Sequence, residues 1–297
     1  MNEHARLQDR PAGQTGRGDD VRACPACARP TAHRFLYARN GCDILQCSVC
    51  SLGRTEAAGF DPETYYTRDY FDGGHADGYA DYLGAEPVLR REFAATVDFI
   101  RTFKPGGRLL ELGCAYGFFL AVAKEHFDVT GIEIAEDAAA HGRSLGLNVI
   151  TGAADETMLS GLAPFDVIVL LDVIEHLPDP LGTLALCERH LKPGGIIVLA
   201  TGDFGSWPAR IAGARWRLMT PPQHLWFFTR GSMRGMASSL GLALERFEHP
   251  WKIVPLSLIV FQLKRMLGLK PSRATVASAI GLPANLFDAM RVVLRKP

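Results

Sequence analysis

The chain has 297 residues, a length that suggests two domains or one large domain with an appendage. Hydrophobic residues make up 47% and charged residues 22%, which excludes wholesale disorder. The 32 basic and 32 acidic residues give a formal net charge of zero, which argues against a dedicated nucleic-acid-binding protein.

The N-terminal segment is polar. Residues 1–22 are rich in Gly, Arg, Asp and Gln and are predicted to form a flexible tail. This segment has no apolar stretch of the kind found in a signal peptide. The longest apolar run of the chain, Ile253 to Leu263, is too short to span a membrane. We therefore expect a cytoplasmic protein.

Five of the seven cysteines lie between positions 24 and 50, inside a predicted module of residues 23–55. Two Cys-x-x-Cys pairs, Cys24 with Cys27 and Cys47 with Cys50, are separated by 19 residues. This spacing is typical of a zinc ribbon, in which four thiolates surround one tetrahedral ion and leave no position for water. The sequence therefore predicts a structural Zn²⁺ site. Free thiols or disulfides are the alternatives, and neither accounts for two paired motifs.

Residues 56–95 contain five of the seven tyrosines and are predicted to form a helical lid or linker. Tyr65, Tyr66 and Tyr70 are candidates to close over a site, or simply to pack against helices. An apolar pattern with helical spacing begins near Val88 and ends at the Lys-Pro-Gly-Gly segment of residues 104–107.

Strands and helices are predicted to alternate through the core, residues 96–250. Two segments, Phe165–Asp172 and Ile196–Thr201, are as apolar as strands buried on both faces. The alternation predicts an α/β fold with a doubly wound parallel sheet. Predicted strands are 108–113, 129–134, 148–151, 165–172 and 196–201, with late strands over 242–249 and 289–294, and predicted helices are 118–126, 135–145 and 180–191.

A glycine turn joins the first of these strands to the helix that follows. Gly113 and Gly117 allow the backbone to approach a ligand closely. Glu133 ends the next strand, where an acid can accept both ribose hydroxyls of a nucleoside. A dinucleotide site requires Gly-x-Gly-x-x-Gly, whereas this chain has Glu111-x-Gly-x-x-x-Gly. A carboxylate beside the turn favours a cofactor with a cationic amino-acid end and disfavours an NAD-dependent oxidoreductase.

Four segments resemble the class I S-adenosylmethionine (SAM)-dependent methyltransferases: ELGCAYGFF (111–119), GIEI (131–134), FDVIVLLDVIEHLPDP (165–180) and LKPGGIIVLAT (191–201). The resemblance implies a Rossmann-like sheet of seven strands with the last one antiparallel, and SAM as the cofactor. It also implies a set of cofactor-binding residues. Those at the methionine end would be Glu111, Gly113, Gly117, Leu171 and Asp172, with Glu133 at the ribose and Ile134 and Asp155 at the adenine. Cys114 and Ala115 of the turn complete the cofactor-binding set, and for Cys114 packing is the alternative. For Asp155 a solvated loop position is the alternative.

Two histidines are candidate catalytic residues. His224 lies in TPPQHLWFFT (220–229), which resembles the acceptor side of the same family. A neutral imidazole there can take the hydroxyl proton of an acceptor. The alternative for His224 is to anchor the Pro-Pro loop. His176 directly follows a predicted strand, and we expect it to support the loop beside the cofactor rather than to transfer a proton.

The cysteine module, the Tyr-rich segment and the core together resemble a bacterial methyltransferase subgroup associated with sugars, polysaccharides and other natural products. This resemblance implies in-line methyl transfer to an oxygen of a carbohydrate or other small-molecule acceptor. Two alternatives stay open: an RNA methyltransferase docked through the ribbon, and a non-catalytic SAM-binding scaffold. Binding to nucleic acid is disfavoured, because the module is only mildly basic. The sequence does not indicate an oligomeric state.

The C-terminal residues 251–297 carry eight lysines and arginines against one acid, Asp288. Residues 251–269 are predicted to form a helix packed on the sheet ahead of the last strand. The alternative is an amphipathic helix at the membrane surface, which would suit a lipid-linked acceptor and a peripheral location.

Overall fold

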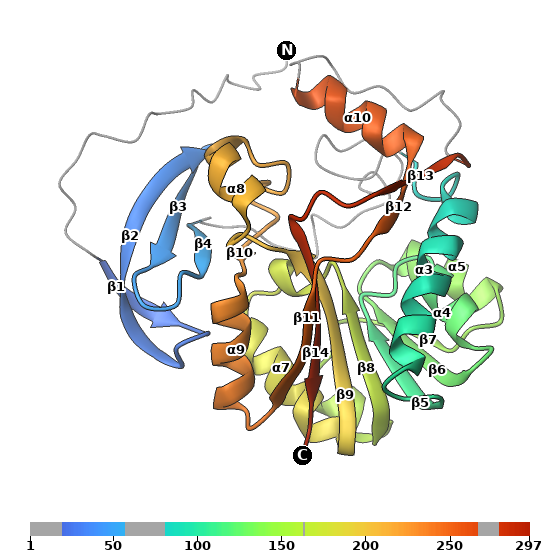
Figure 1. Ribbon diagram of the computed structural model, residues 1–297. Coiled ribbons are helices and arrows are strands. Elements are labelled where there is room, and N and C mark those ends of the chain that lie inside the picture. Colours follow the sequence, from blue (N-terminus) through green and yellow to red (C-terminus); the bar gives the residue numbers. More distant parts are fainter. Residues whose placement is uncertain (1–19, 57–80, 163, 267–278) are drawn as a thin grey trace.

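The computed structural model describes residues 20–56, 81–162, 164–266 and 279–297. It contains a larger α/β unit and, beside it, a smaller antiparallel sheet that bears the paired cysteines (Figure 1). Several predicted features lie outside the described residues. They are the predicted tail up to residue 19, the part of the Tyr-rich segment that contains Tyr65, Tyr66 and Tyr70, and residues 267–269 of the predicted C-terminal helix.

The larger sheet has seven strands in the order β11-β14-β9-β8-β5-β6-β7. β14 runs antiparallel to the other six strands, which confirms the predicted Rossmann-like sheet with an antiparallel last strand. The chain starts in the middle at β5 and later returns to β8 on the other side, so a ligand-binding switch point lies between these two strands. The strands are β5 (Gly107–Leu112), β6 (Phe127–Glu133), β7 (Val149–Thr151), β8 (Phe165–Leu171), β9 (Leu191–Gly202), β11 (Ala243–Glu248) and β14 (Ala289–Arg295).

Helices cover both faces of this sheet (Figure 1). One layer contains α3 (Glu86–Arg101), α4 (Phe118–Ala123) and α5 (Glu136–Ser144), and the other contains α7 (Pro180–His190) and α9 (Arg230–Ser239). Alternate residues of β8 belong to two different apolar clusters: Val167 and Val169 pack with the first layer, and Ile168 and Leu170 with the second. The continuous apolar run of β8 is therefore what a strand covered on both faces requires.

Helix starts follow from capping residues in the sequence. The side chain of Asp179 accepts the Gly182 N–H at the start of α7, and Thr229 forms a capping box with Ser232 at the start of α9. One predicted boundary is wrong. Residues 192–195 were expected to separate helix from strand, but they belong to β9, because Gly194 and Gly195 exchange backbone hydrogen bonds with Lys296 after the last strand.

The smaller sheet consists of β1 (Asp20–Cys24), β2 (Arg29–Arg39), β3 (Cys42–Cys47), β4 (Gly53–Glu56) and a fifth strand, β10 (Trp226–Phe227). β1 begins at Asp20, within the segment expected to be tail, because Asp20 pairs with His33 of β2. This sheet packs on α8 (Trp207–Ala212) and η2 (Gly213–Arg215) through an apolar cluster that includes Ile44 and Phe204. The two units thus share a strand and a core.

The late helix was predicted over 251–269, but it begins later, as α10 (Leu256–Met266). Residues 252–255 are instead a strand, β12 (Lys252–Pro255), because they pair with β13 (Gly281–Ala284). β12 contacts α3, since the Ile253 N–H donates to the Glu92 carboxylate. Among the described helices, none has both the length and the apolar character needed to cross a bilayer. A short helix, α6 (Glu156–Ser160), completes the core between β7 and β8.

The turn that follows β5 requires glycine at position 113. Gly113 has a φ of +70°, and a Cβ there would lie 2.6 Å from Val173 Cγ2. Gly146 has a similar φ of +73°, with nothing within 4 Å of its Cβ position. We expect Gly113→Ala to lower the free energy of unfolding by roughly 3 kcal/mol, from left-handed strain plus overpacking, and Gly146→Ala by about 1 kcal/mol from strain alone. Urea denaturation measures both values, and equal losses would contradict the role given to Val173.

Candidate functional site

The turn between β5 and α4 presents backbone groups at the carboxyl edge of the sheet. Gly113, Ala115 and Gly117 all have positive φ values, and for Ala115 this is a strained conformation. The Ala115 N–H donates to Glu133 Oε2 at 2.8 Å, which ties the turn to the end of β6. Three of the predicted cofactor-binding residues are therefore gathered in one sharp turn.

Two buried carboxylates lie beside this turn. Glu111 is 3% exposed, and its Oε2 has no hydrogen-bond partner among the described residues. Burial raises the pKa of Glu111 well above its usual value, and the nearby charge of Glu133 raises it further. Glu133 is also buried, but its two oxygens accept the backbone N–H groups of Ala115 and Ala135. Because a buried carboxylate without a partner is costly, Glu111 is suited to receive a cationic ligand group.

The other predicted cofactor residues differ in their surroundings. Cys114 is buried under the turn, and burial raises the pKa of its thiol. Ile134 and Leu171 are half-buried at the ends of β6 and β8. Asp172 has a φ of +54°, and its carboxylate lies 3.5 Å from Lys252 Nζ of β12. Asp155 is exposed and accepts the Met158 N–H as the N-cap of α6, so the structure gives it a local structural contact.

Tyr82 also faces this site, although sequence reasoning did not single it out. Its ring is buried and lies 5.7 Å from the ring of Tyr116 and 5.5 Å from that of Phe118. Burial raises the pKa of Tyr82, and the charges of Glu111 and Glu133 raise it further. The only feature of the sequence that could have pointed to Tyr82 was its position in the Tyr-rich segment.

The two candidate histidines lie against each other. His176 ends the short helix η1 (Ile174–His176), and its ring lies 4.7 Å from the ring of His224, edge to face. His176 Nδ1 lies 2.9 Å from the Gln223 carbonyl oxygen, so it donates a proton to the loop that bears His224. Burial lowers the pKa of His176 to about 4, so its ring is neutral at pH 7. This contact supports the loop that carries His224, and the expected support of the loop beside the cofactor stays a prediction.

Glu175 completes this group and was not predicted as a site residue. It is 3% exposed, and its Oε2 has no hydrogen-bond partner among the described residues. Burial raises its pKa, and the charge of Asp172 adds to the shift. Ligand atoms of Glu175, His176 and His224 all lie within 4.8 Å of one another, a spacing that can also admit a cation. The adjacent Glu-His pair after an apolar strand was a sequence signal for this cluster.

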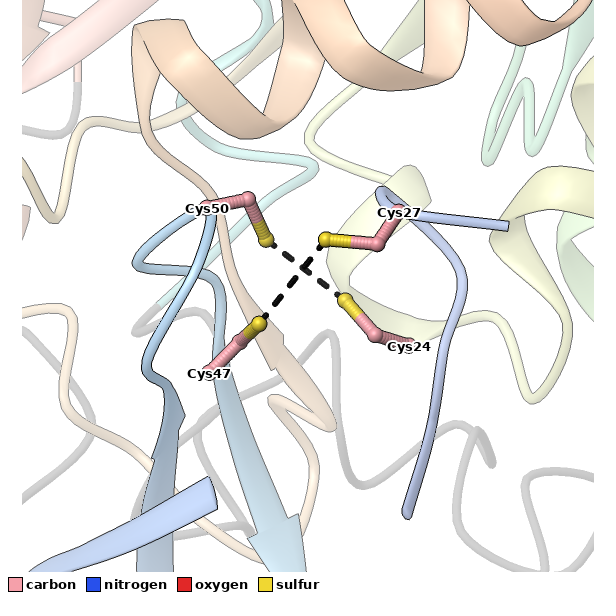
Figure 2. A group of neighbouring side chains, drawn as sticks. All are labelled: Cys24, Cys27, Cys47 and Cys50. Carbon is pink, nitrogen blue, oxygen red and sulfur yellow. Dashed lines mark hydrogen bonds between the residues drawn. The ribbon is translucent and has the colours of Figure 1, made fainter. Parts of the chain in front are cut away.

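The four paired cysteines converge on one point between the two knuckles (Figure 2). The Sγ atoms of Cys24 and Cys50 are 3.5 Å apart, and those of Cys27 and Cys47 are 3.9 Å apart. Tetrahedral coordination with Zn–S bonds of ~2.3 Å separates the sulfurs by about 3.8 Å. The geometry therefore fits one zinc ion. In the described part of the chain all seven cysteines are free thiols.

The surroundings of these thiols also fit a cation. The Val49 N–H donates to Cys47 Sγ, and the Thr31 hydroxyl lies 3.1 Å from the same sulfur. Hydrogen bonding to Cys50 lowers the pKa of Cys24, whereas the same bond and burial raise the pKa of Cys50. Without a cation these thiols therefore share protons, because close thiolates repel each other. A divalent ion bound by all four sulfurs would remove this repulsion between the thiolates.

The strand order, the glycine turn and the buried acids at the carboxyl edge define the fold of SAM-dependent methyltransferases. The chain belongs to this class, since the family model for the methyltransferase domain matches residues 87–246, more than half of its length. The ubiquinone biosynthesis O-methyltransferase of Methylococcus capsulatus is 31% identical over 162 residues, which cover 51% of this chain and 68% of that protein. The protein of the same name from Cereibacter sphaeroides is 32% identical over 178 residues, covering 56% and 69%.

Solved structures show the same fold. One matching chain comes from a complex between the Trm112 methyltransferase activator and a putative methyltransferase of Haloferax volcanii. It is 13% identical, with a TM-score of 0.50, and the match covers 75% of this chain and 98% of that one. At this identity the match concerns the fold alone.

For the cysteine cluster we predict about one zinc ion per chain. Replacing Cys47 with serine removes a ligand, so Cys47→Ser is expected to lose the metal. Cys42 lies outside the cluster at the start of β3, where its thiol contacts the Asn40 carbonyl oxygen, so Cys42→Ser is expected to keep it. Elemental analysis of the purified variants measures the metal content. Equal zinc content in the two variants would rule out the four-cysteine site.

For Glu111 we predict opposite effects on cofactor binding and on stability. Glu111→Gln keeps the shape but removes a charge-assisted hydrogen bond worth about 1.5–3 kcal/mol, so SAM affinity is expected to fall about 10- to 100-fold. Because the folded state raises the pKa of Glu111, its ionisation at neutral pH opposes folding, and the cofactor-free variant is expected to be more stable at pH 7. Calorimetric titration and thermal unfolding measure these effects. The matched control is Glu136→Gln on the exposed face of α5, and a normal SAM affinity in Glu111→Gln would contradict the assignment.

Proposed function

We propose that this enzyme transfers the methyl group of SAM to an oxygen atom of a small acceptor that carries a ring and a negative charge. The observation that carries the proposal is the cluster of Glu175, His176 and His224 beside Asp172, at the same edge of the sheet as the glycine turn. The relatives from Methylococcus capsulatus and Cereibacter sphaeroides are named O-methyltransferases, which favours oxygen over nitrogen or carbon.

In this proposal the predicted cofactor residues hold SAM. The unpartnered Glu111 carboxylate receives the cationic amino group, and the turn at Gly113, Ala115 and Gly117 approaches the methionine end above Cys114. Glu133 binds the ribose hydroxyls with the oxygen lone pairs that its two backbone contacts leave available. The remaining assignments are Ile134 and Asp155 to the adenine, and Leu171 and Asp172 to the methionyl part.

When bound, SAM supplies an activated methyl group on a sulfonium centre. The protein must hold the acceptor oxygen in line and remove its proton. His224 is the group we assign to the proton, since it lies on the acceptor side and its ring packs on the ring of His176. His176 keeps the loop in position through its bond to the Gln223 carbonyl oxygen. A carboxyl oxygen of Glu175 lies within 4.8 Å of a ring nitrogen of each histidine, so Glu175 belongs to the same cluster.

A cleft of about 1170 Å³ between the cysteine-bearing sheet and the core supports the acceptor class. Its lining includes Arg34, Arg210 and Arg230, none of which has a carboxylate partner among the described residues. The one acid that lines it, Asp203, is buried and contacts His249 at 2.8 Å. His224 does not line the cleft: Phe204 of the cleft wall lies 5.6 Å from Phe227, which lies 6.3 Å from His224, so two buried rings stand between them. An anionic sugar or aromatic compound matches this charge and these rings.

The proposal also covers the metal and the location. We assign a structural Zn²⁺ to the four cysteines, because a complete set of thiol ligands leaves no open coordination position. Unpaired thiols that hold a metal require a reducing compartment, which supports the cytoplasm. If the acceptor is lipid-linked, the reaction takes place at the inner membrane surface.

The test uses SAM with a labelled methyl group, the purified enzyme and a host extract that is afterwards fractionated. We expect label in small anionic ring compounds. We expect His224→Gln to reduce the labelling rate at least ~100-fold with normal SAM affinity, because a general base contributes about 10²- to 10⁴-fold. The matched control is His126→Gln, since His126 is exposed and lies away from the acceptor side.

Each other result contradicts a different part of the proposal. Label in RNA would make the cysteine module a docking domain and overturn the acceptor class. Normal turnover in His224→Gln would exclude His224 as the base and leave it as a loop anchor. SAM binding without any labelled product would favour a non-catalytic scaffold.

A further inference from the structure

The loop that carries His224 lies between the core and the cysteine-bearing sheet. On the core side, the Leu225 N–H donates to the Glu175 carbonyl oxygen at 2.8 Å. The Trp226 indole N–H donates to the Leu177 carbonyl oxygen at 2.9 Å. Together with the bond from His176 to Gln223, these contacts hold only one side of the loop, residues 220–229.

The cysteine-bearing sheet holds the other side. Thr55 of β4 donates twice, from its hydroxyl to the His224 carbonyl oxygen at 2.6 Å and from its N–H to the Leu225 carbonyl oxygen at 2.9 Å. The Asn40 amide donates to the Pro221 carbonyl oxygen at 2.8 Å. The cysteine-bearing sheet thus donates hydrogen bonds to three carbonyl oxygens of the loop.

The end of the loop becomes a strand of that sheet. Trp226 pairs with Arg54, and Phe227 pairs with Gly53 in antiparallel register. The approach is close at Gly53, where a Cβ would lie 2.9 Å from Phe227 Cβ. The Arg54 guanidinium also lies over the Trp226 ring at 5.5 Å. Strand pairing and side-chain contacts therefore fix the loop in one register.

The second cysteine knuckle leads directly into β4, the strand that makes the contacts to His224, Leu225, Trp226 and Phe227. Cys47 ends β3 and Cys50 comes three residues before β4, so a metal held by both fixes the start of the strand that contains Thr55. The Cys50 carbonyl oxygen itself accepts the Thr229 hydroxyl at 3.3 Å, at the far end of the loop. The knuckle thus touches the loop directly at Thr229 and through β4 at His224.

From these contacts we infer that the metal-bound cysteine sheet is a working part of the acceptor site, with Thr55 as the residue that positions His224. Metal binding and loop order are coupled: an empty cysteine cluster frees β4, and the loop then loses the donors for its carbonyls. The inference rests on the proposed role of His224 in methyl transfer. It assigns Thr55 no contact with the acceptor.

The first test uses hydrogen–deuterium exchange of the full-length, metal-loaded protein. Thr55→Val removes the hydroxyl but keeps the side-chain shape, so we expect amides of residues 220–229 to exchange at least about tenfold faster. Thr55→Ser restores the hydroxyl and is expected to restore protection. The matched control is Thr96→Val, because Thr96 is also buried and also donates to a carbonyl oxygen, that of Glu92 in α3. Loop exchange in Thr55→Val that equals the wild type would overturn the inference.

The second test removes the metal with a chelator, or by Cys47→Ser, and repeats the exchange measurement. We expect faster exchange both in the cysteine-bearing sheet and in residues 220–229, while β8 and the affinity for SAM stay unchanged. Faster exchange in the cysteine-bearing sheet alone would overturn the coupling. Neither test needs the acceptor, so a failure of His224 as the base, seen as normal turnover in His224→Gln, is distinguishable from a failure of the coupling. With an acceptor in hand, Thr55→Val is expected to lower kcat without raising the KM for SAM.

Discussion

Removing carboxylates from water at the edge of an apolar sheet is the constraint on which this structure depends. The strands around Glu111 and Glu133 are buried on both faces, so neither acid can reach solvent. Burying these carboxylates is unfavourable, and the strained turn after β5 offsets part of that cost for Glu133 by donating the Ala115 N–H to it. Glu111 keeps an oxygen without a protein partner, and a cationic ligand group is the natural complement. The burial of these two carboxylates therefore explains both the hydrogen bond that holds the turn and the preference for a cationic ligand group.

The same principle operates on the acceptor side and at the cysteines. Glu175 is buried beside Asp172, so ionisation of its carboxyl group too is unfavourable unless a positive charge lies nearby. The four thiols are so close together that they share protons unless a cation joins them. Each cluster is unfavourable in isolation and becomes favourable when its missing charge is supplied. This is a common property of functional sites, which retain groups that a purely structural core would exclude.

Sequence patterns predicted the parts of the fold that depend on local chemistry. Apolar runs such as Phe165–Leu171 and caps such as Asp179 act within a few residues, so the strands and helices of the core were predictable to within a few residues at most ends. The spacing of the two cysteine pairs predicted that the four thiols lie close together. The length of β9 was not predictable, because Gly194 is held in the strand by Lys296, about a hundred residues later. Glu175, Tyr82 and the contacts of Thr55 were missed for the same reason, since their burial and partners depend on segments distant in sequence.

The shared strand has a consequence for how the chain reaches its folded state. Thr55 and His224 are 169 residues apart in sequence, and β10 completes a sheet whose first four strands are made near the N-terminus. During synthesis the N-terminal sheet leaves the ribosome with one edge of β4 unpaired, and an open edge invites association with other chains. That edge closes only after the first strands of the core have emerged and β10 has followed them. The order of synthesis thus separates the first four strands of the cysteine-bearing sheet from its fifth, β10, by most of the core.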